Sequence, residues 1–161
     1  SMALLHTPEV NTSWEVNKIH SYKSTDIGIA VAIDNGLITP IIRSVERKGL
    51  LEIRDETSDL IVRAREKKLL PSEYQGGTIS ISNLGSYGIK SFTSIINPPQ
   101  SSILSIGAAR KVPVVQDDAI NIDELISITL TADHRLIDGA VGAKFIAYMK
   151  QLIENPNLML L

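Results

Sequence analysis

The chain has 161 residues, of which 43% are apolar and 21% are charged, with a net charge of −2 and no cysteine. This length suffices for one domain with a sizeable core. The nearly balanced charge argues against nucleic acid or an acidic membrane surface as the main partner, and no apolar run is long enough to cross a membrane. The absence of cysteine excludes disulfides, thiolate metal sites and a cysteine acyl-enzyme.

The first part of the chain predicts short strands and one hairpin. Residues 3–7 are too few for a stable helix and suggest the end of a longer one. Residues 14–22 predict a short strand. Residues 26–33 alternate large and small apolar side chains, which indicates a strand whose small-residue face sits against something close. The Asn35-Gly36 pair predicts a hairpin turn, and residues 37–45 predict the returning strand.

The middle of the chain predicts one long helix followed by a strand. Residues 50–69 have the spacing of an amphipathic helix, and Pro71 and the Gly76-Gly77 pair end that unit. Residues 78–83 alternate as a strand and open into a glycine-containing loop at residues 84–88. The expected apolar stripe of the helix consists of Ile53, Leu60, Ile61 and Ala64.

The last third predicts two further strands, a hairpin and a helix. A strand is expected over residues 102–108, after the break at Asn97-Pro98-Pro99. Residues 112–115 are expected to pair with residues 120–122 across Asp117-Asp118. A strand over residues 125–132 then precedes a helix over residues 140–153, whose apolar face consists of Val141, Phe145, Tyr148, Met149 and Leu152.

His134 is the first candidate for a general base. It lies where the predicted strand hands over to the predicted helix, between Asp133 and Arg135. A neutral imidazole can accept a proton near neutral pH, because its reference pKa is about 6.5. The other two histidines, His6 and His20, have no companion pattern and are expected to be surface or edge residues.

Asp138 has two interpretations, and both are kept. It stands where the N-cap of the following helix is expected, and it could also fix the loop that carries His134. A metal site formed by His134 and Asp138 lacks further ligands at a suitable spacing. A Ser-His-Asp hydrolase is disfavoured because no Gly-x-Ser-x-Gly elbow occurs. From the alternation alone, Ser80 and Ser82 are ordinary members of a strand.

The carboxyl-terminal tail also has two interpretations. Residues 158–161 are all apolar, which is unusual for a free chain end. The tail either folds back on the core of its own domain or docks on a neighbouring subunit.

The stretch from Asp133 to Gly139 resembles the histidine-containing motif of the dihydrolipoamide acyltransferases, the core components of 2-oxo acid dehydrogenase complexes. Further stretches agree with that family in order and spacing over essentially the whole chain. The loop after Ser82 is most similar to that of the acetyl-transferring members, which belong to the pyruvate dehydrogenase complex. The agreeing stretches are residues 26–32, 77–85, 88–92 and 96–100.

The resemblance implies an α/β fold like that of chloramphenicol acetyltransferase, with a mixed β-sheet covered by helices in two layers. It implies homotrimers with active sites at the subunit interfaces, assembled into a larger core that the apolar tail helps to join. His134 then acts as the base on a thiol, and Ser82 donates a hydrogen bond to the oxyanion, reaching across the interface towards a neighbour's His134. Asp138 supports the site, and Asn83 and Gly85 are the expected coenzyme A contacts.

The substrates implied are coenzyme A, or acetyl-CoA, and a lipoyl group delivered by a separate domain, with no metal. Partners implied are lipoyl domains and the dehydrogenase components, with neither nucleic acid nor membrane, in the bacterial cytoplasm or the mitochondrial matrix. The chemistry is sound on its own terms: a thiol of pKa about 8.5 is mostly protonated at neutral pH and needs a base to become a strong nucleophile.

The sequence also departs from the family's full form. Residues 1–2 look like a tag remnant, and residues 3–161 look like an acyltransferase catalytic domain that lacks its N-terminal part. We expect such a chain to keep the fold with impaired or lost activity. Two alternatives to acetyl transfer stay open, namely a succinyl or branched-chain acyl substrate and a core scaffold that does no chemistry.

Overall fold

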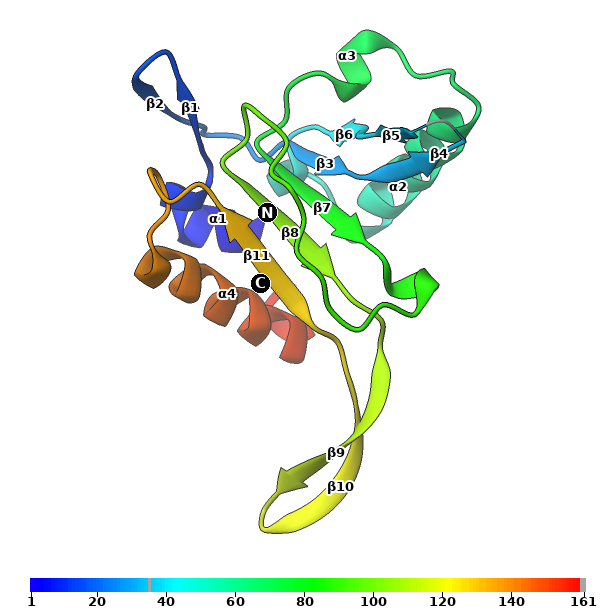
Figure 1. The fold of residues 1–161 in the computed structure, drawn as a ribbon, viewed down its shortest axis with the longest axis vertical. Coiled ribbons are helices and arrows are strands. Elements are labelled where there is room, and N and C mark those ends of the chain that lie inside the picture. Colours follow the sequence, from blue (N-terminus) through cyan, green and yellow to red (C-terminus); the bar gives the residue numbers. More distant parts are fainter. Residues whose placement is uncertain (35, 160–161) are drawn as a thin grey trace.

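A five-stranded mixed sheet forms the centre of the molecule in a computed structural model, which describes residues 1–34 and 36–159 (Figure 1). Three neighbouring strands in the middle of the sheet run parallel, and each outer strand pairs antiparallel with its neighbour. The mixed sheet predicted from the sequence is therefore confirmed. In spatial order the strands are β11 (Ile128–Ala132), β8 (Ser102–Ile106), β7 (Ile79–Asn83), β3 (Ile27–Ile29) and β6 (Ile41–Ile42).

Helices cover one face of this sheet. In Figure 1, α1 and α4 lie beside β11 and β8, while α2 lies at the other end, near β3 and β4. Short 3-10 helices occupy residues 8–10, 45–47, 85–87 and 156–159. No helix of the described residues is both long and apolar enough to cross a membrane. The α-helices are α1 (Met2–His6), α2 (Leu50–Arg65), α3 (Pro71–Tyr74) and α4 (Gly139–Glu154).

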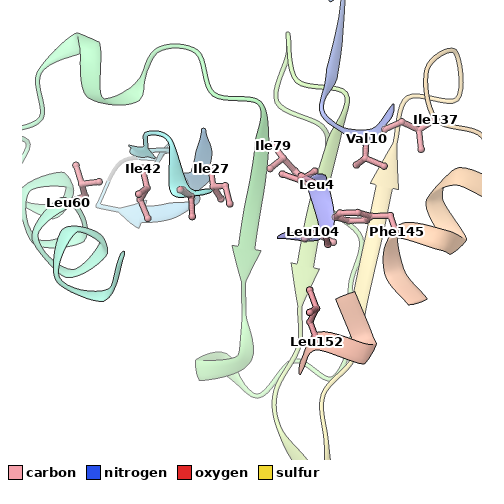
Figure 2. Packing of buried hydrophobic residues seen from close by; sticks show 12 residues of the cluster. Leu4, Val10, Ile27, Ile42, Leu60, Ile79, Leu104, Ile137, Phe145 and Leu152 are labelled. Atoms are coloured by element: carbon pink, nitrogen blue, oxygen red, sulfur yellow. The ribbon is translucent and has the colours of Figure 1, made fainter. Parts of the chain in front are cut away.

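Apolar side chains from both layers meet in one core, which Figure 2 shows. Phe145 of α4 is 2% exposed and lies beside Leu104 of β8, and Leu60 of α2 lies near Ile42 at the far end. The alternation of the strands explains this, because every second residue of a strand points to the helix-covered face. Leu158 and Met159 also pack against this core, whereas residues 160–161 lie outside the described part. The fold-back interpretation therefore holds for those two residues.

Three hairpins surround the sheet. The predicted pairing of residues 112–115 with residues 120–122 is confirmed, because Val115 lies opposite Ile120. The single strand predicted over residues 14–22 is wrong: Val16 and Asn17 take φ of 44° and 63° and turn the chain back on itself. The hairpins are β1 (Thr12–Glu15) with β2 (Lys18–Ser21), β4 (Val31–Ile33) with β5 (Gly36–Ile38), and β9 (Arg110–Gln116) with β10 (Ala119–Leu125).

The strand predicted over residues 26–33 is interrupted at Ala30, where the chain changes partner. Ile29 N donates to Pro40 O, but Ala30 N donates to Ile81 O of β7. The expected close approach to the small-residue face occurs at Gly28, where a Cβ would lie 2.7 Å from Thr39 Cγ2. The hairpin turn predicted at Asn35-Gly36 includes Asn35, which lies outside the described residues.

The predicted helix over residues 50–69 ends earlier, at Arg65. Lys67 takes a φ of 59°, and the amides of Lys67 and Lys68 donate back to the carbonyls of Ala64 and Arg63. A left-handed residue at this position ends a helix by satisfying its last free carbonyls. Leu60 and Ala64 are buried, as the predicted stripe requires.

The sheet face opposite the helices carries short polar side chains. A segment over residues 88–100 crosses this face in front of β7 and β8 (Figure 1). It is tied down where Ser94 Oγ lies 2.7 Å from Ser105 Oγ, and where Ser80 Oγ donates to Gln100 Oε1 at 2.6 Å. Gly107 admits this segment, because a Cβ there would overlap the carbonyl of Lys90. The carboxyl end of β7, with Ser82, therefore lies beside this covering segment.

Candidate active site

His134 lies on a tight turn between β11 and α4. The carbonyl of Asp133 accepts hydrogen bonds from the amides of Leu136 and Ile137, both at 3.0 Å. Asp133 N donates to Ser101 O at 2.8 Å, and Ile137 is buried in the core. Both ends of the turn are thus fixed, while His134 itself is exposed at its tip. An imidazole in this place is accessible from solvent.

The two charged residues that flank His134 bind each other. Arg135 Nε and Nη2 donate to the Asp133 carboxylate, with a shortest distance of 2.6 Å, and Arg135 N donates to Asp133 Oδ1 at 3.0 Å. Hydrogen bonds from Arg135 hold the pKa of Asp133 below its usual value, against the effect of partial burial. The guanidinium also lies over the ring of Trp14, 5.0 Å from its centroid.

Asp138 caps helix α4. Its Oδ1 accepts a hydrogen bond from Val141 N at 2.8 Å, and its carbonyl accepts one from Gly142 N at 3.0 Å. A carboxylate is favoured there because the first helical amides have no partner within the helix. The capping interpretation of Asp138 is confirmed. Within the described residues no hydrogen bond joins Asp138 to His134.

Ser82 lies near the carboxyl end of β7 and is half-buried. It shares a sheet face with Ser80 and Ser105, because β7 and β8 pair Ser82 with Ser105. The hydroxyls of Ser80 and Ser105 are bound by Gln100 and Ser94. No hydrogen bond links the Ser82 hydroxyl to any described group of the chain, so it is available to a ligand.

Ser82 and His134 do not meet within one chain. Ser82 lies opposite Ser105 on β8, whereas Ala132 of β11 lies opposite Ser102 of the same strand. Asp133 then hydrogen-bonds to Ser101, so His134 lies still further from Ser82. Ser82 and Ala132 are therefore separated by three residues along the strands, roughly 10 Å, and by two strand spacings across the sheet, also roughly 10 Å. The arrowheads of β7 and β11 in Figure 1 point to opposite ends of the sheet accordingly.

The loop residues predicted to contact coenzyme A have local structural roles. Asn83 Oδ1 accepts a hydrogen bond from Gly85 N at 2.8 Å and so shapes the short helical turn that follows β7. Gly85 lies close to the backbone of Gly107, because a Cβ added at Gly85 would lie 3.2 Å from the carbonyl oxygen of Gly107. Their contact with coenzyme A stays a prediction.

A separate cavity of about 870 Å³ lies on the helix-covered side, and neither Ser82 nor His134 lines it. It is lined mainly by apolar side chains of α1, α2, α4 and the sheet, including Ile79, Leu104 and Phe145. Its mainly apolar lining is the kind expected of a packing site.

The remaining histidines are placed elsewhere, as predicted. The ring of His6 stacks on Tyr148 with centroids 3.8 Å apart, and His20 is exposed, 3.8 Å from Glu15. Across residues 1–34 and 36–159 there is no group of three or more histidine or acidic side chains close enough to hold a metal ion.

Sequence reasoning missed two residues next to the site. Trp14 comes from a distant hairpin, and nothing in its local pattern relates it to Arg135. Gln100 stands at the end of the matching stretch 96–100, and no role follows from that match. It is buried and forms hydrogen bonds with Ser80 Oγ and Gly76 O. The buried amide could have been suspected from its place directly after two prolines and before a strand.

Relatives with known names match nearly the whole chain. A dihydrolipoyllysine-residue acetyltransferase component of the pyruvate dehydrogenase complex from Rickettsia bellii is 52% identical over 99% of this chain. The match covers 38% of that relative, so the chain spans little more than a third of its length.

Solved structures agree with the sequence matches. A dihydrolipoamide acetyltransferase from Azotobacter vinelandii, studied for the role of one serine, one histidine and one asparagine in its catalytic mechanism, has a TM-score of 0.94 and 35% identity. The match covers 98% of this chain and 66% of that one. The cubic core of a pyruvate dehydrogenase multienzyme complex gives the same TM-score at 34% identity, with the same coverage of 98% and 66%.

The expected likeness to chloramphenicol acetyltransferase is confirmed for the fold. That enzyme has a TM-score of 0.52 and 19% identity, over 89% of this chain and 69% of that one. The family model of the 2-oxoacid dehydrogenases acyltransferase (catalytic domain) matches residues 1–161. The chain belongs to this family of acyltransferase catalytic domains.

Proposed function

We propose that the protein containing this chain moves an acetyl group between dihydrolipoamide and coenzyme A. The observation that carries the proposal is a spacing. In the Azotobacter enzyme the serine precedes the histidine by 52 positions and the asparagine follows it by four. Ser82, His134 and Asp138 stand at the same two spacings, with an aspartate in place of the asparagine.

In this mechanism His134 removes the proton from the attacking thiol. The sulfur forms its bond to the thioester carbon while the imidazole takes the proton, and the same proton is later returned to the departing thiolate. A positioned base of this kind contributes typically about 10²–10⁴-fold to the rate. The exposed place of His134 on a fixed turn supports this role.

Ser82 supplies the hydrogen bond to the oxyanion. Negative charge grows on the thioester oxygen as the tetrahedral intermediate forms, and a donor aimed at it favours the transition state over the substrate. The neighbouring hydroxyls of Ser80 and Ser105 are already bound, whereas that of Ser82 is left for a ligand.

The two groups act together across a subunit interface. Because Ser82 and His134 lie at opposite ends of one sheet, the active site needs Ser82 of one copy beside His134 of another. The hairpin of β9 and β10 protrudes with an apolar face, including Ile120 at 78% exposure and Ile122 at 76%. Such a face supports association, since a lone two-stranded hairpin is marginally stable in water. A homotrimer within a larger core, like the cubic core of the matched structure, fits both observations.

Asp138 supports this site indirectly in the proposed mechanism. By capping α4, Asp138 holds the start of this helix, which directly follows the turn that carries His134. The role needs a hydrogen-bond acceptor at the helix N-terminus, which either an aspartate or an asparagine provides.

Coenzyme A and a lipoyl group carried by another domain are the proposed substrates, and lipoyl domains and dehydrogenase components are the proposed partners. The compartment is then the bacterial cytoplasm or the mitochondrial matrix. The Rickettsia relative is named an acetyltransferase, which favours acetyl over succinyl or branched acyl groups. Profiling of acyl-CoA substrates tests this choice.

We further propose that residues 3–161 are the later part of the catalytic domain. This chain covers 66% of the solved Azotobacter chain. The cavity of about 870 Å³ beside Ser1 is apolar, and a segment of the whole protein outside this chain would fill it. On that basis this chain alone keeps the fold and has impaired or no activity.

The decisive experiment replaces His134 in the full-length protein. His134→Ala should lower kcat for acetyl transfer by at least about 10²-fold, because the thiol then has no base. Size-exclusion chromatography with light scattering should show an unchanged assembly, and His20→Ala serves as the matched control. If the variant keeps the wild-type kcat, the domain is a scaffold or uses another base.

A further inference from the structure

The residues on either side of His134 form one connected unit with a residue from the first hairpin. The guanidinium of Arg135 donates to the Asp133 carboxylate through Nε and Nη2, and its central carbon lies over the ring of Trp14, 5.0 Å from the ring centroid. Contacts with both a carboxylate and an indole restrict where the guanidinium can lie.

Trp14 is itself carried by a fixed platform. It pairs with Ile19 in the β1–β2 hairpin, and the preceding Ser13 is fully buried and bridges to Gln100. The next residue along, Ser101, accepts the hydrogen bond of Asp133 N and donates through its hydroxyl to Val10 O at 3.4 Å. The first hairpin and the His134 turn are therefore attached to two adjacent residues, Gln100 and Ser101.

We propose that Trp14 is a positioning residue for His134, acting through Arg135 and Asp133. The inference rests on the proposed function for the role of His134, but its structural part stands apart from it. Trp14 fixes Arg135, Arg135 fixes the Asp133 carboxylate, and that carboxylate accepts Arg135 N and so holds the backbone on both sides of His134.

Global stability does not account for this arrangement. The Arg135 side chain is 60% exposed, and ion pairs this exposed contribute little to folding. Holding the reacting group is a more demanding task, because a displacement of about 1 Å can cost roughly 10²-fold in rate. The pair also places equal and opposite charges beside His134, with the Asp138 carboxylate engaged by the α4 amide of Val141.

The first experiment measures the order of the turn without requiring activity. Hydrogen–deuterium exchange followed by mass spectrometry reports on the amides of Leu136 and Ile137, which donate to Asp133 O. Trp14→Leu should speed their exchange by roughly two- to fivefold, the scale of an exposed cation–π contact. Trp14→Phe keeps an aromatic face and should speed it less. Lys150→Gln, which breaks the ion pair with Glu154 further along α4, is the control.

The second experiment uses acetyl transfer by the full-length protein. Trp14→Leu should lower kcat roughly tenfold with KM nearly unchanged, because the base is misplaced while the substrate still binds. Asp133→Asn leaves Arg135 unpaired and should move the acidic limb of the pH–rate profile to lower pH. Arg135→Gln leaves Asp133 unpaired and should move the limb to higher pH. These two shifts report on the charges beside His134, whereas positioning by Trp14 is tested by kcat and by amide exchange.

The two readouts separate the possible failures. Unchanged exchange of the Leu136 and Ile137 amides in Trp14→Leu would overturn the proposed positioning, whatever the activity. If exchange speeds up as expected but His134→Ala keeps the wild-type kcat, the positioned residue is not the base and the proposed function fails. If His134 is essential and Trp14→Leu leaves kcat unchanged, the positioning has no catalytic effect and this inference is rejected.

Discussion

Ser82 differs from the two serines beside it in what its hydroxyl can do. Ser80 and Ser105 face the covering segment and are bound by it, through Gln100 and Ser94. Ser82 is half-buried near the end of β7, and its hydroxyl has no hydrogen bond to the described part of the chain. A hydroxyl so placed loses nothing when a ligand oxygen accepts its hydrogen bond.

Removing that hydroxyl should slow the chemistry and spare binding. Ser82→Ala is expected to lower kcat by about 10²–10³-fold, the range found when one oxyanion donor is removed. Steady-state kinetics of the full-length protein give the test, with KM nearly unchanged because the donor acts mainly on the transition state. Ser86→Ala, in the exposed loop that follows β7, is the matched control. A wild-type kcat for Ser82→Ala would remove Ser82 from the mechanism.

Local sequence predicted some residues of the site and could not predict others. An aspartate directly before a helical pattern is a strong capping signal, so the capping role of Asp138 could be predicted. The strand before His134 and the helix after it could be predicted from their periodic patterns. Trp14 was not, because its contact with Arg135 joins a hairpin to a turn far along the chain, and no periodic pattern encodes such a contact.

At the scale of elements, one ion pair joins α2 to α3. Arg63 donates to both carboxylate oxygens of Glu73 at 2.7 Å, and Leu70 N donates to the same carboxylate. Hydrogen bonds from Arg63, followed by that of the Leu70 amide, lower the pKa of Glu73 from 4.5 to about 2. The free energy of unfolding therefore depends on the protonation of Glu73 at acidic pH.

Glu73→Gln should destabilise the protein at neutral pH and have progressively less effect in acid. A carboxyl group whose pKa is lower in the folded than in the unfolded chain stabilises the fold above the unfolded pKa. That contribution is lost as the pH falls from about 4.5 towards 2. Thermal unfolding at pH 7 and at pH 3 measures the difference from wild type, with Glu124→Gln on β10 as the control. A difference that stays constant between these pH values would contradict the assignment.

The elements that the sequence predicted wrongly share a cause. The turn between β1 and β2 is made by Val16 and Asn17, and a left-handed Lys67 follows the end of α2 at Arg65. Positive φ is uncommon for side chains other than glycine and asparagine, so valine and lysine carried no visible signal. The helical stripes and the alternating strand over residues 78–83 were predicted correctly, because burial of one face imposes their period, whereas the strands predicted over residues 26–33 and 37–45 are each divided in two.

At the scale of the whole molecule, the sheet keeps the two catalytic candidates apart. Ser82 lies towards one end of the strands and His134 beyond the other. Each active site in the proposed trimer then takes one residue from each of two copies, and a closed ring of copies repeats this pairing at every interface. A substitution of Ser82 and a substitution of His134 in the same chain therefore affect two different active sites of the ring.

Mixed assemblies of two inactive variants should regain activity. When Ser82→Ala and His134→Ala chains are coexpressed in equal amounts and assemble at random, about a quarter of the interfaces combine an intact Ser82 with an intact His134. Acetyl transfer by the copurified assembly should approach that fraction of wild type. Mixing the separately assembled variants, without exchange of subunits, is the control and should stay inactive. Inactive coassembled protein would show that both residues serve the same half of the site.

The separation of these two side chains also ties turnover to concentration. In the proposed mechanism a single protomer carries a base and a hydroxyl that cannot reach the same thioester, so it is inactive even when it is folded. Dilution below the dissociation constant of the ring would therefore abolish the reaction without unfolding the chains, and specific activity would rise with protein concentration until every ring is closed.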